Sequence, residues 1–529
     1  MSTASTYSAP TAVADTPSRG RWWAVGALAL VAAIGGLDNT VVVTALPTLS
    51  EKLHASTDEL QWIVDAYTLA LSGTLLLFGA LGDRFGRRRV LLLGLLLFGA
   101  SSVIASQMTS AGGLIALRAV MGVGAAPIVV LTYSVLPSMF VAEKQQRLRA
   151  VAILSAITFV GLALGPLVGG FLLNRYAWGS IFLINAPIVA IALFAVWRLV
   201  PETKDPHAAG LDWLGAALSV AGVSALVYGI IEQPMYGWAD ARVLAGIIIG
   251  IALLTIFAVE QLRGRLRLAD LQLFGRPLFG WSTFAIAIVM FALGGVFFML
   301  PQFLQIVQAN DAQATGIRML PLMGGLIVGA AFADQLTVKA GYKTMVAAGM
   351  LVSAAGAVLL SLIGADSGFG SIAAAEAVIG LGMGLVLPTA GDAIVGELPD
   401  GESGSGFALM RTAQFVALAL GVAVLGSILN ATYRSGLDSH LAGLPAPAVA
   451  AAKQSVAATR GLAPHIFAAA RTAYANGMSD VMLVSAAILF AAAVLVAFLL
   501  PSRATRARGS EQECQEPRRP STNQQRGSL

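Results

Sequence analysis

The chain has 529 residues, of which 57% are hydrophobic and only 12% are charged. A soluble protein of this size would carry roughly a quarter charged residues, so the composition excludes an ordinary soluble enzyme or binding domain. The formal net charge is +5, and a single cysteine, Cys514, excludes a disulfide framework.

The apolar residues are concentrated in blocks of about 18–25, the length that a helix needs to cross roughly 30 Å of hydrocarbon. The spans are expected near residues 22–46, 60–80, 90–108, 112–136, 150–173, 180–200, 211–231, 242–260, 279–301, 315–336, 344–363, 371–394, 406–430 and 479–500. The expected fold class is therefore an all-α integral membrane protein with about fourteen transmembrane helices.

The first block follows Arg19 and Arg21 and has no small-residue cleavage site after it, so we interpret it as an uncleaved span rather than a signal peptide. Basic residues gather in alternate connections, at 84–89, 144–149, 263–267 and 339–343. By the positive-inside rule these connections face the cytoplasm. We expect a multi-pass plasma (inner) membrane protein with both termini cytoplasmic, although the acidic connection 397–405 departs from the rule. Orientation explains the basic clusters better than nucleic-acid binding does.

The spans divide into six, two and six. We expect a cytoplasmic tail at 1–21, an N-terminal six-helix bundle at 22–200, a linker with two extra transmembrane helices at 201–268, a C-terminal six-helix bundle at 269–500 and a cytoplasmic tail at 501–529. The C-terminal bundle includes a long external connection, 431–478, parts of which could lie on the membrane surface. A weak repeat relates GDRFGRRR (82–89) to ADQLTVKAGYK (333–343). Two related halves around a midplane site are typical of a secondary transporter.

The first span ends with GLDNTVVVTALP (36–47), in which Asp38 is the only charge after Arg21. An Asp at the centre of a transmembrane helix costs about 2.5–3.5 kcal/mol and usually has a function. Because burial favours the neutral acid, such a group can bind and release a proton. The alternative is a structural Asp that hydrogen-bonds a neighbouring helix.

The second span carries a polar stripe in LQWIVDAYTLALSG (60–73). Gln61, Asp65, Thr68 and Ser72 recur at helical spacing and share one face, which predicts that they line a cavity or the bundle interior. Asp65 could instead be solvated near the external interface. Carboxylates here could attract cations, exchange protons, or do both in competition.

Arg118 in ALRAVMGVGAA (116–126) is the only basic residue inside the first bundle. Its candidate partners are Asp38, Asp65 and backbone carbonyls, and the alternative is that its side chain reaches the membrane surface.

The fifth span contains GLALGPLVGG (161–170), in which Gly161, Gly165 and Gly169 form a flat stripe suited to close helix packing. Pro166 should bend this helix. A general packing face is the alternative interpretation.

The connection GALGDRFGRRRV (79–90) combines a tight turn with charges that could latch the two bundles together, or it could simply orient the chain. Its candidate gate residues are Gly82, Asp83, Arg84, Gly86, Arg87 and Arg88.

In the second half, Asp392 and Arg411 are weaker candidates, and Asp334 and Glu376 lie near predicted span ends, where an interfacial position is expected. We find no nucleotide-binding loop and no clustered metal ligands. We therefore expect no cofactor, no metal and no enzymatic activity, with a proton gradient as the energy source.

Together these segments resemble the major facilitator superfamily, in particular its fourteen-span drug:proton antiporters. GALGDRFGRRRV matches the superfamily's loop signature, LDNTVVVTALP the first-helix signature of the fourteen-span branch, ALRAVMGVG the fourth-helix motif and GLALGPLVGG the fifth-helix antiporter motif. LQWIVDAYTL and FLINAPI also resemble the branch. The likeness extends over residues 22–500, with a departure at ADQLTVKAGYK.

This resemblance implies that Asp38 couples protons to substrate and that Arg118 assists proton transfer. It implies that Gly165, Pro166 and Gly169 shape the antiport interface, and that Asp83, Arg84 and Arg88 gate the cytoplasmic side. The expected function is proton-coupled export of an organic cation or antibiotic by a monomer in the lipid bilayer. The alternatives are a narrow-spectrum exporter of an endogenous antibiotic or metabolite and a proton-coupled nutrient importer.

Overall fold

The computed structural model describes residues 18–140, 143–204, 212–263, 271–397, 403–441 and 444–501. Within these ranges, fourteen helices are long and apolar enough to cross a membrane, so the expected all-α membrane fold is confirmed. Most of both expected tails, most of the 201–210 linker, the basic residues at 265 and 267 and part of the acidic connection 397–405 lie outside the described residues.

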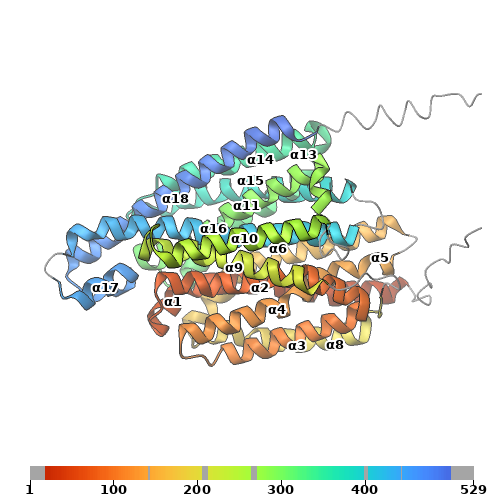
Figure 1. Ribbon diagram of the computed structural model, residues 1–529, viewed down its shortest axis with the longest axis horizontal. Helices are drawn as coiled ribbons and strands as arrows, with labels where there is room; N and C mark the ends of the chain where they lie inside the picture. The colour runs from red at the N-terminus through yellow and green to blue at the C-terminus, as the bar shows by residue number, and fades with distance from the viewer. Residues whose placement is uncertain are drawn as a thin grey trace, which may run out of the picture.

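Six of these spans precede residue 200 (Figure 1). They are formed by α1 (Ser18–Leu53), α2 (Thr57–Phe85), α3 (Arg87–Ala105), α4 (Ala111–Ser134), α6 (Lys144–Arg175) and the consecutive α7 (Ser180–Leu183) and α8 (Asn185–Leu199), with the short α5 (Leu136–Met139) before α6. Local sequence sets the boundaries: Ser56 and Glu59 form a capping box at the start of α2. Gly86, with φ 111°, makes the turn between α2 and α3.

Two further spans follow, α9 (Trp213–Tyr236) and α10 (Ala241–Arg263). The last six are formed by η1 (Leu271–Gly275) leading into α11 (Pro277–Gln302) and η2 (Phe303–Val307), α12 (Ala312–Arg318) with α13 (Leu320–Ala340), α14 (Tyr342–Ser361), α15 (Phe369–Glu397), α16 (Ser403–Leu437) and α18 (Pro464–Leu499).

The connection between α16 and α18 is shorter than the expected 431–478. Helix α16 continues to Leu437 and α18 already begins at Pro464, so the apolar stretch HIFAAARTAY forms the first turns of α18 rather than a separate surface segment. The connection itself folds into η3 (Asp438–His440), α17 (Ala446–Gln454) and η4 (Ala457–Gly461). The end of the molecule at which α17 lies is termed the α17 end, and the opposite end, near α5, the α5 end (Figure 1).

The two halves pack their helices in the same pairwise pattern. In the first half α1 packs on α6, and α4 packs on both α2 and α3; in the second, α11 packs on α16, and α15 packs on both α13 and α14. The inserted pair packs together, and α9 contacts α2 of one half and α16 of the other. The pair therefore lies against the junction of the halves.

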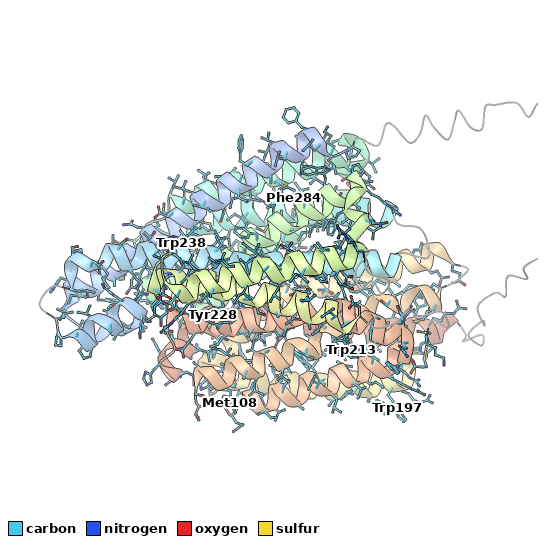
Figure 2. The ribbon with its side chains drawn as sticks, in the orientation of Figure 1. Met108, Trp197, Trp213, Tyr228, Trp238 and Phe284 are labelled. Atoms are coloured by element: carbon cyan, nitrogen blue, oxygen red, sulfur yellow. The ribbon has the colours of Figure 1, made fainter. Side chains whose placement is uncertain are left out.

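Aromatic side chains mark both ends of the lipid-facing surface (Figure 2). Trp197 and Trp213 are 60% and 59% exposed near the α5 end, and Trp238 is 63% exposed near the α17 end. Tryptophan favours the membrane–water interface because its ring is apolar and its N–H needs a polar partner.

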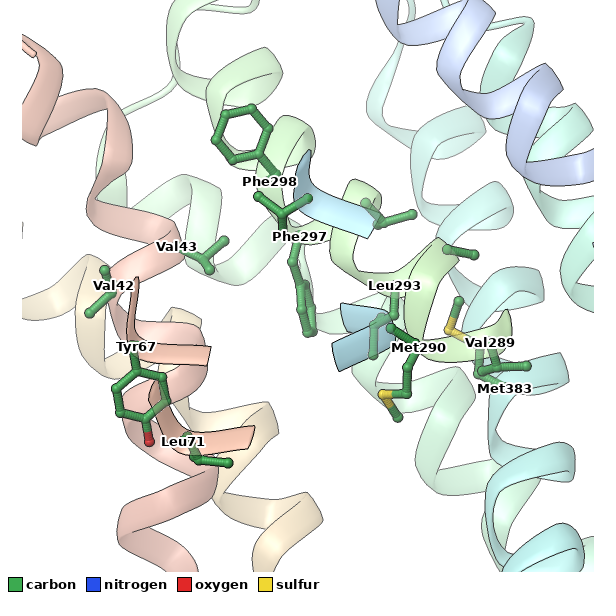
Figure 3. Packing of buried hydrophobic residues seen from close by; sticks show 14 of the residues in the cluster. Val42, Val43, Tyr67, Leu71, Val289, Met290, Leu293, Phe297, Phe298 and Met383 are labelled. Atoms are coloured by element: carbon green, nitrogen blue, oxygen red, sulfur yellow. The ribbon is translucent and has the colours of Figure 1, made fainter. Parts of the chain in front are cut away.

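One apolar core joins the two halves. It includes Val42 and Val43 of α1 and Tyr67 of α2 on one side, and Phe297 and Met290 of α11 on the other (Figure 3). Such packing, rather than exclusion of water, holds helices together where the surrounding lipid is as apolar as the side chains themselves.

Candidate functional site

A buried ion pair joins the first and fourth spans. Asp38 of α1 is 1% exposed and Arg118 of α4 is 2% exposed, and the Arg118 Nη1 donates to Asp38 Oδ2 at 2.9 Å. Arg118 thus has the first of its expected partners, and the alternative of a side chain that reaches the membrane surface is wrong. Removing either partner from such a pair is expected to cost several kcal/mol, about 3–5, because the other charge would be left buried and uncompensated.

The second carboxylate oxygen of Asp38 is also occupied. Asn185, at the start of α8, donates from Nδ2 to Asp38 Oδ1 at 3.0 Å and to Ser102 Oγ of α3 at 3.0 Å. The Ser102 hydroxyl in turn donates to the Phe182 carbonyl. Asp38 therefore lies at the centre of a polar network that connects α1, α3, α4, α7 and α8.

Arg118 also holds the second span. Its Nε donates to the Ile63 carbonyl at 3.1 Å, and its guanidinium carbon lies 4.2 Å from the centre of the Tyr67 ring. A desolvated contact between a cation and an aromatic ring contributes about 2 kcal/mol or more. Ile63 and Tyr67 are four residues apart on one face of α2, so Arg118 fixes that face against α4.

Asp65 lies between those two residues in sequence but on another face of α2. It is fully buried, and within the described part of the chain neither of its carboxylate oxygens has a hydrogen-bond partner. Solvation near the external interface, the alternative considered for this residue, is therefore wrong. Asp65 is not brought into the Asp38–Arg118 pair.

The face of α2 that carries Asp65 packs against α16 and α9. One turn before Asp65, Gln61 donates from Nε2 to the Val422 carbonyl of α16 at 3.1 Å. One turn after it, Leu69 packs with Ala419 of α16 and Val223 of α9. Since residues four apart share a helix face, the Asp65 carboxyl lies at the junction of the two halves.

The remaining members of the stripe, Thr68 and Ser72, are each 2% exposed. Their hydroxyls donate to carbonyls of their own helix, Val64 and Leu69 respectively. They lie in the bundle interior, one of the two positions that the spacing predicted.

The glycine stripe of α6 lies against α1. A Cβ at Gly161 would lie 2.7 Å from the Ala33 carbonyl, one at Gly165 would overlap the Thr40 hydroxyl, and one at Gly169 would lie 3.2 Å from the Val41 carbonyl. Next to this stripe, the Pro166 carbonyl abuts Gly316 of α12. The motif therefore packs α6 closely on α1 and contacts the second half.

The basic turn between α2 and α3 is held by contacts within the first half. Arg87 pairs with Asp83 at 2.8 Å and donates to the Ser134 carbonyl at the end of α4. The Arg88 amide donates to Glu202, which follows α8. Gly82 lies against Leu131 of α4, and the guanidinium of Arg84 lies 5.7 Å from the Phe85 ring. In the described residues these charges do not pair with the second half.

Arg411 of α16 contributes to the junction near the α5 end. Its guanidinium lies 5.6 Å from the ring of Tyr133 in α4 and 5.0 Å from that of Phe407. Asp392 and Asp334 are both exposed. Glu376, in contrast, was expected to be interfacial and is fully buried, because α15 is covered on two sides by α13 and α14.

Sequence reasoning did not single out Asn185 or Ser102. The only signal was the polar Asn in the apolar FLINAPI stretch, which supported a family likeness without indicating a partner for Asp38. Tyr67 was also missed, because an aromatic residue in an apolar helix is ordinarily part of the core.

The chain as a whole is similar to a known family of proteins. Residues 28–422 match the model of the Major Facilitator Superfamily. The chain is 33% identical to the "Multidrug efflux pump LfrA" of Mycolicibacterium smegmatis over 91% of this chain and 96% of that protein. It is 30% identical to the "Methyl viologen resistance protein SmvA" of Salmonella typhimurium over 82% and 88%, and 33% identical to the "Cephamycin export protein CmcT" of Amycolatopsis lactamdurans over 77% and 84%.

The fold has close counterparts among solved structures. A bacterial homolog of the human lysosomal transporter Spinster, in an inward-facing and unoccupied conformation, aligns with a TM-score of 0.64 at 17% identity, covering 92% of this chain and 98% of that one. A D-xylose–proton symporter aligns with a TM-score of 0.62 at 15% identity, covering 91% and 98%. The chain is a multi-pass membrane transporter that belongs to the Major Facilitator Superfamily.

Proposed function

We propose that this protein exports lipophilic cations or antibiotics across the plasma membrane in exchange for protons, by alternating access of the two bundles. The relatives described above, named as efflux, resistance and export proteins, support export. The basic turns gather at the α5 end, so we assign this end and both termini to the cytoplasm. The α17 end is then external.

The observation that carries the proposal is the difference between two buried acids. Asp38 has both oxygens occupied, by Arg118 and Asn185, so its negative charge is compensated. Asp65 has neither a cation nor a hydrogen-bond donor in the described residues. An uncompensated carboxyl that is shielded from water is held most easily with a proton bound. Asp65 is therefore the group at which a proton and a cationic substrate compete.

Helix α2 connects this exchange to the rest of the first bundle. Arg118 holds one face of α2 at Ile63 and Tyr67, while Asp65 and Gln61 face α16 in the other bundle. When Asp65 loses its proton, its new charge at the junction disfavours close packing of α2 on α16 until a cation or water reaches it. The charge state of one residue thereby biases which side of the junction is open.

Release of the proton to the cytoplasm charges Asp65 and admits an organic cation, and reorientation of the bundles exposes the site to the exterior. A proton then displaces the cation, which leaves. The Asp38–Arg118–Asn185 network keeps α1, α4 and α8 in register throughout.

Drug accumulation in cells tests this proposal. In a pump-deficient bacterial host, expression of the wild type should lower accumulation of methyl viologen or of a cationic dye, and a protonophore should abolish the difference. Asp65→Asn should reach the membrane in normal amount and give accumulation equal to the empty host. The matched control, Asp392→Asn, removes an exposed acid and should export like the wild type. Normal export by Asp65→Asn would refute the assignment of Asp65.

A narrow-spectrum exporter of an endogenous antibiotic is the second candidate. It is favoured by the 33% identity to a cephamycin export protein and the 30% identity to the puromycin resistance protein pur8 of Streptomyces alboniger. A panel of cationic dyes and antibiotics in the same host distinguishes the two, because protection against a single chemical class would favour this candidate.

A further inference from the structure

The close contacts around α4 include two glycines. A Cβ at Gly122 would meet the Tyr67 carbonyl of α2, and one at Gly124 would lie 2.7 Å from the Phe98 amide of α3. Arg118 is one turn before Gly122 on the same face of α4.

The same contacts recur around α15 in the second half. A Cβ at Gly380 would meet the Leu322 carbonyl of α13, and one at Gly382 would meet the amide of Ser353 in α14. The surrounding sequences agree as well, with RAVMGVGA at 118–125 and EAVIGLGM at 376–383. Glu376 thus occupies the position in the second bundle that Arg118 occupies in the first.

The first helices of the two halves can be matched in the same way. A Cβ at Gly36 of α1 would meet the backbone of Thr158 and Leu162 in α6, and one at Gly294 of α11 would meet the backbone of Leu418 and Val422 in α16. Two residues after each glycine stand Asp38 and Val296. The second bundle therefore has Glu376 at the position of Arg118. It has the apolar Val296 at the position of Asp38, the partner of Arg118.

Glu376 is fully buried, and within the described residues neither of its carboxylate oxygens has a hydrogen-bond partner. The helices packed against α15 supply no cation nearby. Helix α11 has no charged residue, and the charges of α13 and α14 (Asp334, Lys339 and Lys343) lie toward the α5 end, whereas Glu376 is in the second turn from the α17 end of α15. Among the other charged or titratable groups, Asp392 is near the α5 end of the same helix, and Arg411 and Arg434 lie near the two ends of α16.

The cation of α12, the short helix that precedes α13, already has other partners. Arg318 of α12 donates to Gln308 at 3.2 Å and lies 5.3 Å from the ring of Phe369. The group that does adjoin the carboxyl is the Leu322 amide in the first turn of α13. The free amides of a helix N-terminus favour negative charge, so an ionised Glu376 would gain partial compensation there without a cation.

We propose that Glu376 is a second proton-binding site of the transporter, which takes up a proton from the external side and releases it during each cycle. The inference rests on the proposed proton-coupled export and adds one carried proton in the second bundle. A proton is the ligand that fits, because Glu376 is surrounded by close helix contacts and its neighbours Ala375 and Met383 are also fully buried.

A contact between the two bundles gives their movement a way to change the surroundings of Glu376. Gly316 of α12, four residues before the start of α13, abuts the Pro166 carbonyl of α6 in the first bundle. Opening of the external side separates α12 from α6. The first turn of α13, which adjoins α12, moves with it. Water then reaches the Glu376 carboxyl and exchanges a proton with it.

Counting protons on the purified full chain tests this inference. Tetraphenylphosphonium is added to protein in weakly buffered detergent solution, and the protons released per molecule are measured with a pH indicator. Glu376→Gln should release one proton fewer than the wild type, whereas Glu376→Asp, which keeps the carboxyl group, should release the wild-type number. Size-exclusion profiles and thermal unfolding identify variants that fail to fold.

Unchanged release from folded Glu376→Gln would overturn the inference and leave the proposed function standing. If the wild type releases no protons, the proposed function fails, and infrared spectroscopy then decides on Glu376 alone. A carboxylic-acid C=O band that titrates with pH in the wild type and is lost in Glu376→Gln supports the site. The same band in both proteins overturns it.

Discussion

Arg118 makes three contacts that no other side chain type could combine. Its planar guanidinium pairs with Asp38, donates to the Ile63 carbonyl and lies against the Tyr67 ring. A lysine has one compact charge and could not reach all three. The energetic importance of this residue lies mainly in what its loss would leave behind, a buried carboxylate with only Asn185 as a donor.

We expect Arg118→Met to lower the free energy of unfolding by about 3–5 kcal/mol, because Asp38 would remain buried without its cation. The double variant Asp38→Asn/Arg118→Met should be more stable than Arg118→Met alone, since the uncompensated charge is gone. Thermal unfolding of the purified variants in one detergent measures this coupling. Strictly additive effects of the two substitutions would show that the pair does not act as a unit.

Single residues were predictable where a charge interrupts an apolar block. Asp38, Asp65 and Arg118 stand out in this way, and their burial is confirmed. Asn185 was not predictable as a partner of Asp38, because an amide carries no charge and its neighbour is 147 positions away in the chain. The position of Glu376 was mispredicted, since the sequence shows its nearness to a span end but not the helices that cover it.

At the scale of elements, the close packing of α6 on α1 was indicated by a sequence motif. The stripe of Gly161, Gly165 and Gly169 removes the side chains that would separate the helices, and the Thr40 hydroxyl donates across the contact to the Leu162 carbonyl at 2.9 Å. This glycine stripe is thus a contact surface in which a single methyl group matters.

Gly165→Ala should destabilise the protein by about 1–3 kcal/mol and reduce export, because the added methyl would overlap the Thr40 hydroxyl and push the helices apart. The matched control is Gly26→Ala in α1, where a Cβ would meet no atom within 4 Å. Thermal unfolding and dye accumulation measured in parallel would check both. Wild-type behaviour of Gly165→Ala would mean that the α1–α6 contact tolerates widening.

Helix existence was predictable from the lengths of the apolar blocks, whereas helix ends were not. The last helix begins at Pro464, whereas its start was expected near residue 479. The first turns were not predicted because they mix Ala, His and Arg and therefore lack the hydropathy of a span. Their burial comes from packing on the rest of the molecule, as for Ile466 and Ala470. Periodicity within one segment cannot reveal such a contact.

At the scale of the whole molecule, the α17 end is closed by contacts between the halves. Gln305 donates to the Thr44 carbonyl of α1 at 2.8 Å, and Arg460 pairs with Glu51 at 2.6 Å. Ser50 and Ser455 bring their hydroxyl oxygens within 3.2 Å. The segment that carries Ser455 is tied to α16 where Tyr433 donates to the Ala452 carbonyl. Contacts such as these join residues remote in sequence, so they were not predictable from the apolar blocks.

A reversible crosslink tests whether this end must open. Ser50→Cys/Ser455→Cys, built with Cys514→Ser, should form a disulfide on oxidation, because the paired serine oxygens lie close together. Export should be lost on oxidation and recover with a reductant, while each single cysteine variant remains active. Full export by the oxidised double variant would show that this contact persists throughout the cycle.

The central claim, that a proton bound at Asp65 is exchanged for a cation, is tested most directly in liposomes that contain the purified protein and no other transporter. An imposed pH gradient should drive uptake of tetraphenylphosphonium by the wild type, with protons moving in the opposite direction, and Asp65→Asn should show neither flux. Cation flux that persists in Asp65→Asn, or that is unchanged when the pH gradient is collapsed, would contradict the account.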